Sequence, residues 1–209
     1  MSEGSTNILL SDASEGTVRE DSVFISTAIG WKSVYRYKGM FNEDTELFKT
    51  TDGGSTWIKI ADSSQESSTL PGGVKSGLTF VNDQKGWFTA NAPWEGRVGL
   101  FITTDGGVTW SEERLEVPSI LKTSQIDVYP PLFFTEKLGI LPARPEDKAH
   151  SLLYITSDGG STWQPFLDHK KDQYEGITWV LSEGILSAEY AGHSWGYSIM
   201  SGGKWSSHS

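Results

Sequence analysis

The chain has 209 residues, a formal net charge of −10 and no cysteine, which excludes disulfide bonds and thiolate metal sites. The negative charge would repel nucleic-acid phosphates, and no apolar run approaches the roughly 18 residues of a membrane span. The polar N-terminal stretch also lacks the basic and apolar regions of a signal peptide.

Short apolar or alternating stretches, separated by turn residues, predict strands at 22–26, 31–37, 46–50 and 56–60. No stretch shows sustained helical periodicity, and nine Trp and 23 Gly favour large packed rings joined by tight turns. The chain is therefore predicted to be all-β.

An eight-residue motif repeats along the chain. TTDGGSTW at 50–57 returns as TTDGGVTW at 103–110 and as TSDGGSTW at 156–163, at intervals of 53 residues. A second signal, an apolar residue followed six positions later by Gly, precedes each copy: Phe24–Gly30, Phe80–Gly86 and Phe133–Gly139. A degenerate fourth copy is expected around Gly184–Ile185, with 200–205 in place of the motif. Periods of about 40–50 residues with four strands each are typical of β-propeller blades.

We predict one β-propeller domain or fragment over residues 1–209, with blades at about 21–62, 76–114, 131–168 and 175–209. Residues 1–20 are expected to supply a closing strand centred on 8–10, or to be the remnant of a preceding blade. The sequence leaves the number of blades and the closure of the ring open.

Each TxDGGxTW copy predicts a tight turn before the last strand of its blade. The Asp accepts backbone N–H bonds, the second Gly adopts a positive φ, the Thr begins the strand and the Trp packs across the blade. One carboxylate followed by two glycines lacks the spaced oxygen ligands of a calcium loop, so we expect neither a metal nor a cofactor. The residues predicted to have these structural roles are Asp52, Gly54, Thr56, Trp57, Asp105, Gly107, Thr109, Trp110, Asp158, Gly160, Thr162 and Trp163.

The motif resembles the Asp box, or BNR repeat, of sialidases, sortilin-type receptors, xyloglucanases and photosystem II assembly factors. The Gly–Trp pairs after the first strand make the chain most similar to bacterial relatives of the assembly-factor type, which include secreted or lipid-anchored proteins. The resemblance implies an extracytoplasmic location, with the export signal absent from this chain; a cytoplasmic location is the alternative. Such propellers usually have more than four blades, so a fragment, a four-bladed ring and self-association that completes a ring all stay open.

The motif turns are expected at one end of each blade, so the longer loops at the other end are expected to bind ligands. Loops between second and third strands are predicted at 39–45, 92–97, 144–150 and 191–195, and the loop from the fourth strand of the third blade to the first strand of the fourth blade is predicted at 168–175. Aromatic rings in polar loops can stack on a sugar or peptide, or can fold back as lids on the core. The candidate ligand-binding residues are Trp94, Trp195, His193, Arg97 and Arg144.

These features predict a non-enzymatic binding or assembly module with a glycan or an extracytoplasmic protein or peptide as its partner. The alternative is a carbohydrate-active propeller, either glycan-binding or a glycoside hydrolase. A sialidase would need three converging arginines, and Arg36, Arg97 and Arg144 come from successive blades, but the expected Arg–Ile–Pro type motif is absent. No pair of carboxylates stands out as acid and base, so no catalytic residue is predicted.

Overall fold

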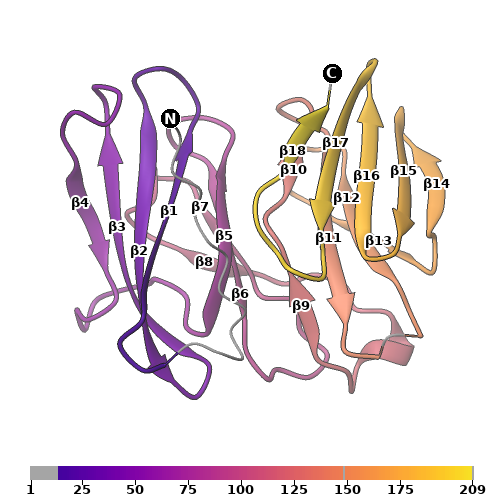
Figure 1. The fold of residues 1–209 in the computed structure, drawn as a ribbon, viewed down its shortest axis with the longest axis horizontal. Helices are drawn as coiled ribbons and strands as arrows, with labels where there is room; N and C mark the ends of the chain where they lie inside the picture. Colours follow the sequence, from indigo (N-terminus) through magenta and orange to yellow (C-terminus); the bar gives the residue numbers. More distant parts are fainter. Residues whose placement is uncertain (1–13, 148, 209) are drawn as a thin grey trace. The chain divides into compact units, whose positions relative to one another are not determined.

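The computed structural model describes residues 14–147 and 149–208, which form four antiparallel sheets of the β-propeller blade type (Figure 1). The predicted all-β propeller fold is confirmed at the level of its blades. The segment 8–10, predicted as a closing strand, lies outside the described residues. Residues 18–20 instead begin the first strand of blade 1, where they pair with residues 34–36.

The strands follow one another along each sheet as a meander. Blade 1 contains β1 (Val18–Phe24), β2 (Gly30–Gly39), β3 (Asn42–Thr50) and β4 (Ile58–Asp62). Blade 2 contains β5 (Val74–Phe80), β6 (Gly86–Asn91), β7 (Leu100–Thr103) and β8 (Ser111–Glu113). A short 3-10 helix, η2 (Ser119–Leu121), follows blade 2.

Blades 3 and 4 have five strands each. Blade 3 contains β9 (Ile126–Val128), β10 (Leu132–Phe133), β11 (Gly139–Pro145), β12 (Leu152–Thr156) and β13 (Gln164–Leu167). Both β9 and β10 pair with β11, as two pieces of a broken first strand. Blade 4 contains β14 (Lys171–Tyr174), β15 (Ile177–Ser182), β16 (Ile185–Tyr190), β17 (His193–Ser198) and β18 (Ser206–His208).

The chain divides into two compact units. The first contains blades 1 and 2; the second contains blades 3 and 4 together with residues 93–99 from the loop between β6 and β7. In the first unit, the ring of Trp31 stacks on Phe80 with centroids 3.6 Å apart. In the second unit, Ile140 and Ile155 of blade 3 share a buried cluster with Trp179 of blade 4. Burial of these apolar side chains from water stabilises each pair of blades.

The two repeated sequence signals meet in space. A Cβ added at Gly30, Gly86 or Gly139 would lie 2.5, 2.6 or 2.9 Å from the ring of the Phe six positions earlier, so only Gly lets that ring lie on the strand. Each Phe ring also meets the Trp of the motif edge to face. The centroid distances are 5.9 Å for Phe24–Trp57, 6.2 Å for Phe80–Trp110 and 5.9 Å for Phe133–Trp163.

The TxDGGxTW turns are closed by hydrogen bonds within the motif. In the first turn, Thr56 donates its backbone N–H to Asp52 Oδ1 at 2.9 Å and its hydroxyl to Asp52 Oδ2 at 2.6 Å, while the Thr50 hydroxyl donates to Oδ1 at 2.8 Å. Bonds from Thr56 and then Thr50 lower the pKa of Asp52 to about 2. Asp105 and Asp158 accept the equivalent bonds. The carboxylates are therefore occupied by their own turns.

The strands of blade 4 begin earlier in the sequence than predicted. The segment 168–175, predicted as a loop, contains β14, so the first-to-second-strand turn ends at Gly176–Ile177 and not at Gly184–Ile185. The predicted loop at 191–195 is wrong: residues 191–192 form a two-residue turn, and His193 and Trp195 belong to β17. The physical reason is that X–Gly dipeptides adopt positive φ and close tight hairpins. Three such turns occur here, at Glu175–Gly176, Glu183–Gly184 and Ala191–Gly192.

Candidate binding site

Trp94 and Arg97 lie together in the loop between β6 and β7. The Arg97 guanidinium carbon lies 4.0 Å from the centroid of the Trp94 ring, and both side chains are half-buried. Gly96 fixes the loop, because its N–H donates to the Ser124 carbonyl at 2.9 Å and a Cβ there would collide with the Lys122 carbonyl. The loop therefore holds a stacked Trp–Arg pair in one position.

Arg144 has internal partners. Its Nη2 pairs with Asp127 across β11 and β9, and its Nη1 donates to the Ile199 carbonyl at 3.0 Å. The Tyr129 hydroxyl donates to the same carbonyl at 2.7 Å. Arg144 thus ties blade 3 to the segment that follows β17, and several of its donors are used within this unit.

Trp195 and His193 lie toward the start of β17, whereas the Ile199 carbonyl that Arg144 binds follows the end of that strand. The Trp195 ring meets Phe134 edge to face at 5.1 Å and lies 6.0 Å from His193. Tyr190 also packs on Phe134, at 5.4 Å. Phe134 begins the turn between β10 and β11, which hydrogen-bonds the TxDGGxTW turn of blade 3 through Lys137. The structure therefore brings Trp195 and His193 together but separates them from Trp94 and Arg97.

The turn between β2 and β3 is unusual in its residues. Met40 and Phe41 are its two central residues, with φ of 51° and 58°, and their side chains are 95% and 56% exposed. Gly39 pairs with Asn42 across the turn, so the hairpin has a two-residue loop. Positive φ at both positions usually selects Asn–Gly or Gly-containing pairs, because bulky residues cost about 1–2 kcal/mol each in this conformation.

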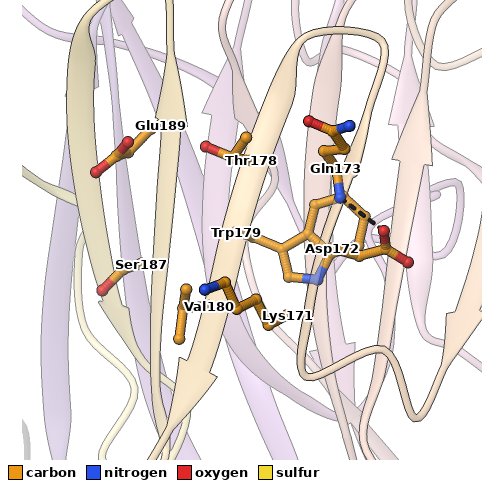
Figure 2. A pocket seen from close by; sticks show the side chains of 8 residues that line it. All are labelled: Lys171, Asp172, Gln173, Thr178, Trp179, Val180, Ser187 and Glu189. Carbon is orange, nitrogen blue, oxygen red and sulfur yellow. Dashed lines mark hydrogen bonds between the residues drawn. The ribbon is translucent and has the colours of Figure 1, made fainter.

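The exposed face of blade 4 carries a groove of about 570 Å³ (Figure 2). The residues that line it come from β14, β15 and β16: Lys171, Asp172, Gln173, Thr178, Trp179, Val180, Ser187 and Glu189. Strand alternation separates them into two sets. Trp179 is 1% exposed and faces the core, where its Nε1 donates to the His169 carbonyl at 2.8 Å. The alternate residues on each strand face solvent.

Sequence reasoning missed this groove because it placed 168–175 in a loop. The signal that could have found it is the period-two alternation of KDQY, ITWVLS and ILSAEY, in which most alternate residues are polar, Val180 and Ile185 being the exceptions. With β14 recognised as a strand, the register would bring these polar positions onto one face.

Sequence reasoning also missed a buried ion cluster in the first unit. The Glu43 side chain is 2% exposed and accepts two hydrogen bonds from Arg19, at 3.2 and 3.0 Å. Lys75, itself 2% exposed, donates its Nζ to the Gly73 carbonyl at 3.0 Å and its backbone N–H to Glu43 Oε2 at 2.9 Å. Burial lowers the pKa of Lys75 to about 8. The cluster joins β1, β3 and β5 and so ties blade 1 to blade 2.

No family model and no curated protein matches the sequence. Among solved structures, the chain is similar to an oligogalacturonate lyase in complex with manganese, with 6% sequence identity and a TM-score of 0.45. The matched region covers 87% of this chain and 49% of the lyase, so the chain spans about half the length of that protein.

Within residues 14–147 and 149–208, no group of three or more His, Asp or Glu side chains is arranged to hold a metal ion. No helix in the same part of the chain has the length and hydropathy needed to cross a bilayer.

Proposed function

We propose that the chain is a non-enzymatic binding module that docks a protein partner through the Met40–Phe41 turn. The observation that carries the proposal is an exposed apolar pair in a backbone conformation that disfavours it. Three other two-residue turns of this chain end in Gly, as the conformation favours. Strain at an exposed position is maintained where the side chains have a use outside the fold.

A protein partner suits this turn better than a lipid surface. Two apolar side chains on one hairpin give too little buried area to hold a chain on a bilayer, and the net charge of −10 opposes anionic lipid. Aromatic residues and Met are enriched where proteins meet. The turn lies at the end of blade 1 opposite its TxDGGxTW turn, where ligand-binding loops are expected.

Trp94 and Arg97 are candidates for a second contact of the same kind, because Trp and Arg are common in the residues that dominate binding energy. The resemblance to bacterial Asp-box propellers supports an extracytoplasmic setting, so the partner is sought there. A second copy of the chain, completing a ring, is one form that the partner could take. A glycan as the ligand of Trp94 remains the alternative function.

A photo-crosslinking experiment tests the proposal. A photoreactive phenylalanine analogue replaces Phe41, and in a matched control it replaces Val108, which is 52% exposed in a TxDGGxTW turn of the same unit. In cells that make the protein, we expect a discrete protein adduct from position 41 and none from position 108. Equal adducts from both positions, or none from either, would contradict the proposal.

A stability measurement complements the crosslinking. Phe41→Gly removes the strain, so we expect the free energy of unfolding to rise by about 1 kcal/mol while the crosslinked partner no longer co-purifies. A fall in stability would mean that Phe41 serves the fold instead.

A further inference from the structure

The exposed face of blade 4 presents hydrogen-bonding side chains that the fold does not use. Gln173, Thr178 and Glu189 form one row across β14, β15 and β16, and Lys171, Val180 and Ser187 form the next. All six are exposed, and Figure 2 shows them spread over the three strands. Because neighbouring strands are about 4.8 Å apart, each row is about 10 Å wide.

Within the described residues, no protein group forms a hydrogen bond with the polar side chains of these two rows. The side chains of Gln173, Glu189 and Lys171 take part in no hydrogen bond or ion pair there; the Gln173 backbone N–H alone bonds to Asp172, at 2.8 Å. Donors and acceptors therefore point from a firmly paired sheet into a groove of about 570 Å³. That volume falls within the range of about 300–1,000 Å³ typical of small-ligand sites.

The chemistry of this face argues against another blade as its occupant. The opposite face of the same sheet buries Ile177, Trp179 and Leu186 against blade 3. Covering Lys171 and Glu189 with an apolar face of that kind would strip both charges of water without giving them partners, at a cost of several kcal/mol. The occupant must instead form hydrogen bonds.

The balance of charges narrows the class of ligand. The groove has one ammonium and two carboxylates, those of Asp172 and Glu189, on a chain with a net charge of −10. A polyanion would be repelled. Among the residues that the structure describes here, a polycation would find only the Glu189 carboxylate without a partner, because Asp172 already pairs with His169. Val180 is the apolar side chain that lines the exposed side of the groove, which leaves no pocket for the side chains of a peptide. A ligand with many hydroxyls satisfies both donors and acceptors.

We propose that this groove binds a neutral glycan. Gln173 and Glu189 accept hydrogen bonds from sugar hydroxyls, and Lys171 donates to hydroxyl or ring oxygens. Thr178 and Ser187 form the polar floor between them. The site is separate from the Met40–Phe41 turn and does not depend on the function proposed for that turn.

The test uses an array of neutral oligosaccharides and polysaccharides, followed by calorimetric titration of the sugar that binds best. Gln173→Ala and Glu189→Ala should each weaken binding by about tenfold or more, because each leaves a sugar hydroxyl without its partner. The matched control is Ser182→Ala, an exposed residue on the same face of β15 that does not line the groove. Its affinity should equal that of the wild type.

Saturable binding that is lost in both groove variants and kept in Ser182→Ala supports the proposal. It is overturned if no neutral glycan binds, if only charged glycans bind, or if both groove variants bind like the wild type. Phe41→Gly should bind the same glycan unchanged, so failure here and failure of the protein-docking function are distinguishable.

Discussion

Replacing the buried Lys75 by Met should change how stability depends on pH. Burial, opposed by Glu43 and aided by Arg19, lowers the pKa of Lys75 from 10.5 to about 8 in the folded chain. Between these two values the unfolded chain holds a proton that the folded chain has released, so stability rises with pH in this window. Each pH unit above the folded pKa is worth about 1.4 kcal/mol. From about pH 7.5 to about pH 9.5, the wild type should therefore gain about 2 kcal/mol relative to Lys75→Met.

The assay is urea unfolding followed by tryptophan fluorescence, at a series of pH values within that window. The matched control is Lys38→Met, because the Lys38 side chain is 47% exposed and pairs with Asp44 at 3.1 Å. Its stability difference from the wild type should stay level over the same pH range. If the difference between the wild type and Lys75→Met also stays level, the ammonium is not desolvated by the fold and the reasoning is refuted.

Two predictions concern the repeats. Asp105→Ala removes the acceptor for Thr109 and for two other donors of its turn. Because water can replace part of these bonds, we expect the free energy of unfolding in urea to fall by about 2 kcal/mol, and by less for Asp105→Asn. A fall below about 0.5 kcal/mol for Asp105→Ala would contradict the account of the turn. Gly86→Ala places a Cβ 2.6 Å from the ring of Phe80, which should cost about 1–3 kcal/mol, whereas Gly72→Ala meets no atom within 4 Å and should leave the melting temperature unchanged.

The blade fold could be predicted because its signals are local and repeated. The Asp, Gly and Trp of each motif act within one hairpin, so their spacing survives any change elsewhere in the chain. Blade 4 was misread for the opposite reason. Its turns use X–Gly pairs, such as Ala191–Gly192, which form no long motif. The sequence therefore predicts the turn between the first two strands at Gly184, one strand later than its position at Gly176.

The candidate sites depend on contacts that no spacing reveals. The stacking of Arg97 on Trp94 follows from local sequence, but the anchoring of Gly96 beside Lys122 joins two separate loops. The half-buried position of Arg144 reflects its bond to the Ile199 carbonyl, 55 residues away. The strain at Met40 is also invisible in sequence, because Met and Phe give no turn signal of their own.

The side chains of the TxDGGxTW turns are engaged by the fold, whereas those of the two proposed binding sites are not. At the motif end, the carboxylate of Asp52 and its counterparts accept bonds from their own turns, and the Trp rings pack on Phe, so little is left to bind a ligand. The Met40–Phe41 turn and the solvent-facing row around Glu189 have the opposite character. Their side chains are exposed, and positive φ strains the backbone at Met40 and Phe41. Residues that the fold does not require are where selection for binding is free to act. A variant that leaves stability unchanged or raised and abolishes binding is therefore the decisive result at either place.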